Sequence, residues 1–439
     1  MNFFPNSNGT YSRRRALQML GGTAASAVLL HGQSLFGAPV GAAQLAPAED
    51  AFLDELERRG CQYFWDQAST KTGQVRDRAA TVGKESRPAT SIAATGFGLS
   101  ALCIAHMHGY LPANDVRERV LTTLRYHLEH LPHSHGFFYH FNDIESGKRL
   151  WQCEVSSIDT TIFLCGALTC RAYFSGEGPD AQIRDLATKL YERVEWPWML
   201  NNGATFSMGW RPESGFLSSR WAQYCELMML YLLGIGSPTN PVAPQTWQNF
   251  TRPYIDYAGF HYISSNAPLF THQYSHAWFD FRHRQDKYAD YFANSILATR
   301  AHKVFCLSYK KMYSDDFWGL TASDSDHGYM VWGGPPVLRP VDGTVVPCAA
   351  AGSLPFLPKD CLHTLIAMKD RYGKYAWGRY GFCDAFHPDA QWYDADVLGI
   401  DQGISVLMAE NLRSGFVWDT FMKNPDAVAA MKKVGFHPV

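Results

Sequence analysis

The sequence has no excess of charge of either sign. Its 439 residues carry 39 Lys and Arg against 41 Asp and Glu, a formal net charge of −2. A near-neutral chain has no electrostatic basis for binding nucleic acid or an anionic membrane surface, so we expect neither partner. The same balance argues against a polysaccharide lyase, which would need a basic cleft for uronates.

Motifs of two common catalytic classes are missing as well. The chain has no GxSxG nucleophile elbow and no CxxC pair or His/Cys ligand spacing, which argues against a serine hydrolase triad and a zinc site. Of its ten cysteines, four lie inside apolar helical patterns, as small buried hydrophobic residues do: Cys103, Cys165, Cys170 and Cys225. We therefore expect free thiols rather than disulfides.

The chain also lacks Gly/Ser/Pro linkers, charge blocks and low-complexity tracts. We therefore predict one large domain over residues 44–439. Residues 1–43 have the pattern of a twin-arginine signal peptide: Arg13-Arg14-Arg15, an apolar run over 16–30, then small residues through Gly41-Ala42-Ala43. A membrane anchor is the alternative, but the run is shorter than the roughly 20 apolar residues that a span needs. We expect a periplasmic or secreted protein with no membrane attachment once the signal is removed.

What the chain does contain is a rhythm of apolar and amphipathic helical patterns joined by long aromatic loops, with few strand signals. Periodicity predicts helices over 48–67, 91–110, 116–131, 157–174, 181–194, 218–238, 288–309, 359–371, 401–412 and 420–434. Apolar helices belong in an inner ring and amphipathic helices in an outer one. The predicted fold is therefore all-α, an (α/α) six-hairpin toroid or barrel.

The stretch from Ser218 to Pro238 is apolar on nearly every side, with one acidic residue, Glu226. We expect a buried helix capped by Ser218 or Ser219, with Glu226 one or two turns from its start. A buried carboxylate must be paired, hydrogen-bonded or used for chemistry. The structural alternative is an ion pair with an arginine such as Arg220 or Arg282.

Other acids lie at the starts of apolar helices. Glu154 and Asp159 flank the start of the helix at Ser157, and Asp401 begins another. If the inner helices are parallel, these acids meet Glu226 at one rim, and paired carboxylates are what glycosidic cleavage needs. Each has a plainer interpretation: Asp159 and Ser156 as a capping box, Asp401 as an N-cap, and Glu154 as an exposed loop acid.

The segment HQYSHAWFDFRHR, residues 272–284, is dense in polar groups among aromatic ones. His272 and His276 are four residues apart, so a metal is conceivable, but the usual partner ligands are missing nearby. We expect this segment to bind sugar hydroxyl groups instead, with Trp278 as a stacking face.

Several long motifs resemble the bacterial glycoamylase-like family, which includes endo-β-1,2-glucanases and a domain of cyclic β-1,2-glucan synthases. They are SIAATGFGLSAL, GFFYHFND, ESGKRLWQCEVSSIDTTIFLCGAL, WAQYCELMMLYLLGIGSP, HQYSHAWFDFR, PCAAAGSLPF, WGRYGFCDAF and GIDQG. The resemblance runs from about Ala51 to the C-terminus. It implies an (α/α) six-hairpin barrel that acts on glucans and requires no metal or organic cofactor.

The resemblance also implies roles for individual residues. Glu226 matches the essential glutamate of the family, Asp401 matches an acidic position, and Asp159 falls where the β-1,2-glucanases carry a glutamate. Ser156 stands where they carry an aspartate, and with Glu154 the segment looks closer to the synthase type. We expect the catalytic residues to be Glu226, with Asp401, Asp159 or Glu154 as its partner. We expect substrate contacts from Trp221, Tyr224, His272, Gln273, His276, Trp278, Asp280, Arg282, Trp318, Asp384 and Phe386.

These observations predict an exported glycoside hydrolase acting on a β-glucan, most simply a β-1,2-linked one, with Glu226 as the general acid. The apolar neighbours of Glu226 favour a protonated carboxyl group there. The missing acid at Ser156 keeps two alternatives open, a transglycosylase and a non-catalytic glucan-binding protein.

Overall fold

The computed structural model describes residues 45–265, 268–339 and 341–439. The predicted export signal, residues 1–43, lies outside the described residues. The chain is mostly helical, and its α-helices are α2 (Pro47–Asp66), α3 (Ile92–His108), α4 (Ala113–Glu129), α5 (Ser157–Tyr173), α6 (Pro179–Glu192), α7 (Trp196–Leu200), α8 (Met228–Gly236), α9 (Tyr291–Ser308), α10 (Pro347–Ala351), α11 (Pro358–Ala376), α12 (Gly399–Arg413), α13 (Phe416–Phe421) and α14 (Pro425–Lys433).

The strands are short and lie in the loops between helices. Those that pair next to helix starts are β1 (Arg78–Ala80) with β18 (Asp396–Leu398), β2 (Ala89–Ser91) with β5 (Phe141–Asp143), and β6 (Val155–Ser156) with β7 (Gly209–Arg211) and β8 (Gly215–Phe216). The other pairs are β3 (His133–Ser134) with β4 (Phe137–Phe138), β9 (Tyr254–Tyr257) with β10 (Phe260–Ile263), β11 (Arg284–Gln285) with β19 (His437–Pro438), β12 (Ala322–Ser323) with β13 (Met330–Val331), β14 (Trp377–Gly378) with β15 (Gly381–Phe382), and β16 (Phe386–His387) with β17 (Trp392–Tyr393).

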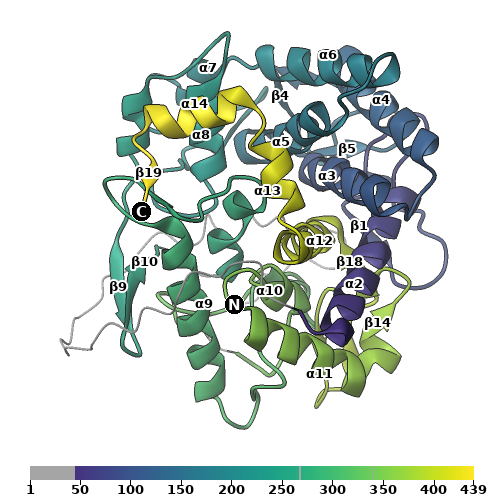
Figure 1. The fold of residues 1–439 in the computed structure, drawn as a ribbon, viewed down its shortest axis with the longest axis vertical. Helices are drawn as coiled ribbons and strands as arrows, with labels where there is room; N and C mark the ends of the chain where they lie inside the picture. Colours follow the sequence, from purple (N-terminus) through teal and green to yellow (C-terminus); the bar gives the residue numbers. More distant parts are fainter. Residues whose placement is uncertain (1–44, 266–267, 340) are drawn as a thin grey trace.

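The apolar helices pack at the centre. In Figure 1, α12 is seen nearly end-on in the middle of the molecule, with α2, α4, α6 and α11 towards the edge. Helix α12 packs against α2, α3 and α10, and α5 packs against α3, α6 and α8. Residues 92–105 of α3 are all buried, whereas α4 and α6 bury one face only, as their amphipathic patterns predict.

Small residues let the two most extensively packed helices, α3 and α5, approach closely. A Cβ atom at Gly96 would stand 2.5 Å from the Cα atom of Phe163, and one at Gly166 would stand 3.0 Å from the Cα atom of Gly96. The first distance is too short for real atoms, and a Cβ atom at Gly166 would stand only 2.0 Å from the Gly96 carbonyl oxygen. The glycines of these apolar helices therefore set the helix spacing.

Most predicted helices are confirmed within a few residues, but two boundaries are wrong. The predicted helix over 420–434 is split into α13 and α14 by Asn424 and Pro425, since proline begins a helix far more easily than it continues one. The predicted helix at Ser218 begins only at Met228. Residues 218–227 are extended or turned, because Trp221 and Tyr224 bond across to Phe206 and Thr251 instead of along a helix.

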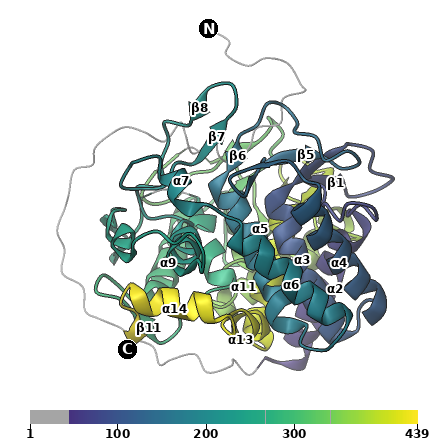
Figure 2. The same cartoon turned by 90° about the horizontal axis from the view of Figure 1, so that it is seen from above.

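Hydrogen bonds between loops join the starts of α12, α3 and α5. The N–H group of Gly399 donates to Asp77, and that of Asp77 donates to Ala89, just before α3. Ile92 donates to His140, whose own N–H group donates to Glu154 before α5. Figure 2 shows β1, β5, β6, β7 and β8 gathered at one end of the molecule and α13 and α14 at the other. These bonds bring the starts of the two helices that carry Asp159 and Asp401 to one rim, together with α3, which the prediction of a shared rim did not include. The place of the Glu226 helix at this rim stays a prediction.

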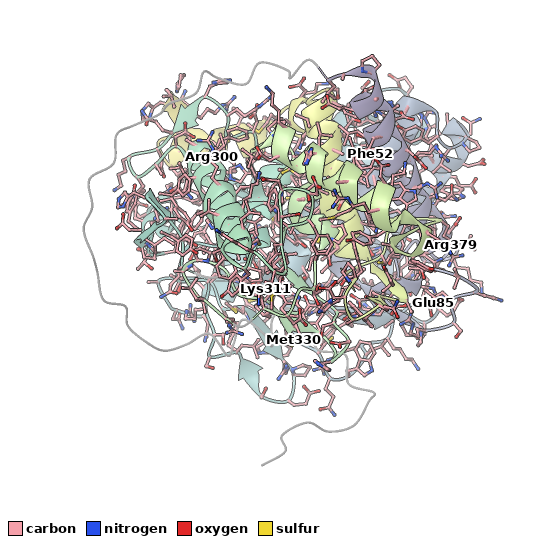
Figure 3. All side chains as sticks on the ribbon, turned by 90° about the horizontal axis from the view of Figure 1, so that it is seen from below. Phe52, Glu85, Arg300, Lys311, Met330 and Arg379 are labelled. Atoms are coloured by element: carbon pink, nitrogen blue, oxygen red, sulfur yellow. The ribbon has the colours of Figure 1, made fainter. Side chains whose placement is uncertain are left out.

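All ten cysteines lie in the described part of the chain, and all are free and buried, as predicted. None of the helices in the described ranges has the length and apolar character needed to cross a bilayer. Seen from below in Figure 3, Met330 and Lys311 lie on the outer surface, and Glu85 and Arg379 lie near each other at one edge, where both bind the backbone of Ala80.

Candidate active site

Two groups of acidic side chains lie at the rim formed by the helix starts. The first is at the start of α5. Ser156 is the N-cap of this helix: its hydroxyl accepts from the N–H group of Asp159 at 3.1 Å and donates to the carboxylate of the same residue. Ser156 therefore caps α5, and the carboxylate of Asp159 binds the Ser156 hydroxyl.

His140 lies between the two carboxylates of this first group and contacts both. Its Nδ1 atom lies 3.3 Å from Oε1 of Glu154, and its Nε2 atom lies 3.7 Å from Oδ2 of Asp159. Arg211 approaches the other oxygen of Glu154 at 3.4 Å. Glu154 is only 4% exposed, so the expectation of an exposed loop acid is wrong. Both carboxylates are held by neighbouring side chains, which fixes their charge in place.

The second group surrounds the start of α12. Asp401 is the third residue of this helix and not its N-cap, which is Leu398. Asp401 and Asp384 line one pocket with Cys348, Gln402 and Ser405. Burial raises the pKa of Asp384 well above its ordinary value, and the neighbouring Asp401 and Asp324 raise it further.

One arginine supplies most of the positive charge in this second group. Arg78 pairs with Asp324 at 2.6 Å and with Asp77 at 3.3 Å. Burial acts to lower the pKa of Arg78, but the surrounding aspartates outweigh it and raise that pKa. Burial also raises the pKa of Asp394 to about 8, with Asp324 adding to the effect. Oxygens of Asp324, Asp384 and Asp394 lie within 4.8 Å of one another, close enough to share a cation, but Arg78 already provides one.

Glu226 lies outside both groups, in the turn before α8. It is 4% exposed, and its carbonyl oxygen accepts from the Ser275 hydroxyl at 2.7 Å. That hydroxyl also accepts from the N–H group of Met229, so Ser275 fixes the turn that precedes the helix. The predicted position within the helix is wrong, but burial of the carboxyl group is confirmed. Of the two arginines considered as its partners, Arg220 binds backbone carbonyls of Leu200 and Thr205 and Arg282 binds Asp280.

The segment that carries Glu226 is anchored to the first acidic group. The indole N–H group of Trp221 donates to the Ser157 hydroxyl, at the first residue of α5, at 2.8 Å. Gly209 of β7 packs under Glu154, because a Cβ atom there would stand 2.7 Å from Cγ of that residue. The Glu226 segment and the start of α5 are therefore held side by side.

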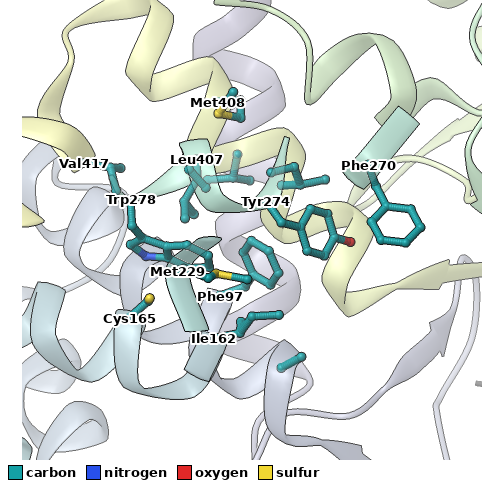
Figure 4. Close-up of a cluster of buried hydrophobic side chains, with 14 of the residues drawn as sticks. Phe97, Ile162, Cys165, Met229, Phe270, Tyr274, Trp278, Leu407, Met408 and Val417 are labelled. Atoms are coloured by element: carbon teal, nitrogen blue, oxygen red, sulfur yellow. The ribbon is translucent and has the colours of Figure 1, made fainter. Parts of the chain in front are cut away.

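Seven of the predicted substrate contacts are at most 1% exposed: Trp221, Tyr224, Gln273, His276, Trp278, Trp318 and Phe386. Trp278 packs against Phe97 with ring centroids 4.9 Å apart (Figure 4). Its indole N–H group donates to Ser100 of α3. Burial lowers the pKa of His276 to about 3, so its imidazole is neutral. The expectation that Trp278 stacks on a sugar is wrong, because both faces of the indole are packed.

Asp280 and Arg282 are also wrongly placed in the predicted site. They form a salt bridge of 2.9 Å, and the guanidinium of Arg282 lies 4.1 Å from the centre of the Trp418 ring. Trp418 belongs to α13, at the end of the molecule opposite the rim (Figure 2). This pair stabilises the far end of the fold.

Tyr224, His272 and Gln273 are buried in or near the Glu226 segment, and the last predicted contact, Asp384, lines the pocket with Asp401. His272 contacts Ser264 through Nε2 at 3.2 Å, and burial lowers its pKa to about 3. Gln273 donates to the Ala349 carbonyl oxygen and to Ser353, and so ties this segment to α10. Tyr224 stacks on Tyr291 with ring centroids 6.0 Å apart. Nε2 of His272 contacts the Ser264 hydroxyl, and Nε2 of His276 contacts the Ser295 hydroxyl.

The sequence interpretation missed His140 and Arg78 as site residues. His140 stood in the quoted motif GFFYHFND, but a lone histidine or arginine in a loop has no periodicity to identify it. An exposed aromatic residue was also missed. Trp151 is 53% exposed, and its ring contacts Phe141, which stacks on His140 at 3.9 Å.

Comparison with known proteins agrees with this geometry. Residues 218–425, which include Glu226, Asp384 and Asp401, match the family model "Glycoamylase: Putative glucoamylase". An endo-β-1,2-glucanase from Chitinophaga pinensis, solved with sophorotriose and glucose, is 28% identical with a TM-score of 0.81, over 89% of this chain and 99% of that one. A "putative glucoamylase" from Bacteroides uniformis is 27% identical with a TM-score of 0.83, over 90% and 98%.

A curated relative is the exo-β-1,2-glucooligosaccharide sophorohydrolase (non-reducing end) of Parabacteroides distasonis, 26% identical over 88% of this chain. The chain spans 58% of the length of that relative. The family model matches residues 218–425, and the similarity to these relatives extends over nearly the whole described chain.

Proposed function

We propose that the protein is a glycoside hydrolase that cleaves β-1,2-linked glucan, and that it acts within the chain. The observation that supports this most is the convergence of carboxyl groups from separate helix starts at one rim. The related proteins from Chitinophaga and Parabacteroides act on β-1,2-glucan or its oligosaccharides. The rim belongs to what we propose is a closed ring of six helix pairs, forming one domain over residues 44–439.

In this proposal Glu226 is the general acid, and Asp401 is the second carboxylate. A buried carboxyl group suits proton donation to the leaving oxygen, while the second carboxylate activates water or attacks the anomeric carbon. Glu154 and Asp159 are each bound by other side chains, to His140 and Arg211 and to the Ser156 cap. In this proposal Glu154 and Asp159 stabilise the structure of the rim. Asp401, which lines the pocket, is then the catalytic partner of Glu226.

We also propose that the protein is exported by the twin-arginine route and works in the periplasm or outside the cell. This route carries folded proteins, and ten buried free thiols fit a chain that folds under reducing conditions. Fractionation of the native host, with a Lys variant of Arg13 and Arg14 as control, would test this. Equal amounts of both proteins outside the cytoplasm would contradict it.

The activity is tested with a panel of linear β-1,2-, β-1,3-, β-1,4- and α-1,4-glucans and cyclic β-1,2-glucan. We expect products from the β-1,2-linked substrates, with a range of chain lengths if cleavage is internal and only disaccharide if it is from one end. Products longer than the substrate would identify transglycosylation. Tight binding without any product over a long incubation would replace this proposal with that of a glucan-binding protein.

A further inference from the structure

Asp384 has unusual surroundings for a carboxyl group. It is 3% exposed, and its Oδ2 atom accepts from the N–H group of Asp324 at 2.8 Å. Its own N–H group donates to the carbonyl oxygen of Asp396 at 3.0 Å, which fixes its backbone to the strand that leads into α12. Its Oδ1 atom is fully buried and has no hydrogen-bond partner within residues 45–265, 268–339 and 341–439. The side chain faces the pocket that Asp401 also lines.

The charges around Asp384 do not balance if every carboxyl group is ionised. The acids that act on Asp384 are Asp401, Asp324 and Asp394. The nearby cation Arg78 interacts with Asp384 and also with Asp77, Asp324 and Asp396, and Arg87 binds Asp396 at 2.6 Å. Cys383 and its buried thiol complete the titratable groups nearby. Carboxylates that share a buried site keep at least one proton among them.

The proton is best placed on Asp384. Arg78 forms salt bridges with Asp77 and Asp324, whereas no salt bridge joins Asp384 to a cation within the described part of the chain. Burial, the charge of Asp401 and a hydrogen bond with Asp401 all raise the pKa of Asp384. A protonated Asp384 can donate to Asp401, whereas two carboxylates would repel each other.

We propose that Asp384 is a positioning residue: it retains a proton and donates a hydrogen bond to the Asp401 carboxylate, which fixes the orientation of that carboxylate in the pocket. The role of Asp401 in catalysis rests on the proposed function. The proton stays on Asp384 throughout, so no bond is formed or broken at this residue. The arrangement is comparable to the third member of a catalytic triad, which orients a reacting group without reacting itself.

Two substitutions at Asp384 distinguish a role as hydrogen-bond donor from a role that depends on the charge of its carboxyl group. Asp384→Asn keeps an N–H donor of similar shape, and we expect its kcat to stay within about threefold of the wild type. Asp384→Ala removes the donor and lets the Asp401 carboxylate turn, and a misplacement of about 1 Å costs on the order of 10²-fold in kcat. We expect KM to change little in both. Asp389→Asn, in the exposed loop five residues later, is the matched control and should behave as the wild type.

The pH profile gives a further readout. The wild type should lose kcat at alkaline pH as Asp384 gives up its proton, and Asp384→Asn should lack that limb because an amide does not titrate. An Asp384→Ala variant with wild-type kcat would overturn the proposal, as would an Asp384→Asn variant that is folded but as inactive as the alanine variant. If the alanine variant does not fold, the pH profile of the Asp384→Asn variant tests the proposal, and an alkaline limb like that of the wild type would overturn it.

Infrared spectroscopy tests the proton without any substrate. At neutral pH the wild type minus Asp384→Asn difference spectrum should contain the carbonyl band of a protonated carboxylic acid. A difference spectrum with only carboxylate bands would overturn the proposal, whatever the activity. An inactive wild type with the protonated band would instead refute the proposed function and leave the proton on Asp384 established.

Discussion

Gly166 of α5 lies against Gly96 of α3 with no room for a side chain between them. A Cβ atom at Gly166 would stand 3.0 Å from the Gly96 Cα atom and closer still to its carbonyl oxygen. The obstacle is helix backbone, which cannot rotate away as a flexible side chain can. The two helices must therefore separate if any larger residue is introduced.

We expect Gly166→Ala to lower the free energy of unfolding by about 3 kcal/mol, the upper range for overpacking a core. The control is Gly373→Ala on α11, where a Cβ atom meets its nearest neighbours at 3.6 Å, an ordinary contact. That change should be neutral or should stabilise by up to about 1 kcal/mol, since alanine favours helix. Urea unfolding measures both. Equal stability of the two variants would contradict the close packing described.

Glu226→Gln tests the general acid. The amide preserves shape but carries no transferable proton, so kcat on β-1,2-glucan should fall by about 10²- to 10⁴-fold. The melting temperature should stay near that of the wild type. Glu213→Gln, at an exposed carboxylate paired with Arg149, is the control and should retain activity. Undiminished hydrolysis by Glu226→Gln would remove this residue from the chemistry.

Trp151 provides an exposed aromatic surface near the first acidic group. If it stacks on a distal sugar of the glucan, Trp151→Ala should raise KM for long substrates about tenfold, or 1.4 kcal/mol, with little change in kcat. Tyr254 is equally exposed, at 53%, on the β9–β10 hairpin across the molecule in Figure 1, and Tyr254→Ala should leave KM unchanged. A KM effect of the same size in both variants would argue against a specific subsite.

The buried Glu57 predicts a pH dependence of stability. It is 0% exposed, and burial together with the nearby Glu410 raises its pKa well above the usual 4.5, with Arg413 acting against them. A raised folded-state pKa gives a contribution that is complete below pH 4.5 and is lost as the pH rises through the folded value. We expect the melting temperature of Glu57→Gln to fall less than that of the wild type between pH 5 and pH 9.

The matched control for this test is Glu118→Gln, on the exposed face of α4. Its melting curve should follow that of the wild type at every pH. Parallel curves for all three proteins would show that Glu57 keeps no proton in the folded state.

The sequence predicted the helices well because each has a periodic pattern that does not depend on its neighbours. The burial of Glu226 and the shared rim of Asp159 and Asp401 followed from the same patterns. The start of α8 could not be predicted from the sequence, because an apolar stretch such as 218–227 is compatible with a helix or with an extended chain. Backbone hydrogen bonds to Phe206 and Thr251 select the extended chain.

The predicted sugar contacts failed for a different reason. A tryptophan flanked by histidines, such as Trp278 beside His276, has the same composition in a binding cleft and in a core that satisfies its polar atoms. Only Ser100, 178 residues away, shows that the indole N–H group is bound inside the protein. The neighbourhood of Asp384 and Asp401 likewise depends on how the loop before α12 returns to β1, which no local pattern contains.

The central position of α12 determines when, during synthesis of the chain, the core contacts between helices can form. This helix packs against α2 and α3, the earliest described helices of the chain, yet it is made from residues 399–413. During synthesis, the faces of α2 and α3 that pack on α12 therefore stay uncovered until nearly the entire chain has been made. Contacts that span most of a chain form slowly and leave apolar surface open to other molecules meanwhile. A nascent chain that ends before residue 399 therefore exposes the apolar faces of α2 and α3 that α12 covers in the folded protein, and we expect it to aggregate more readily than the full chain.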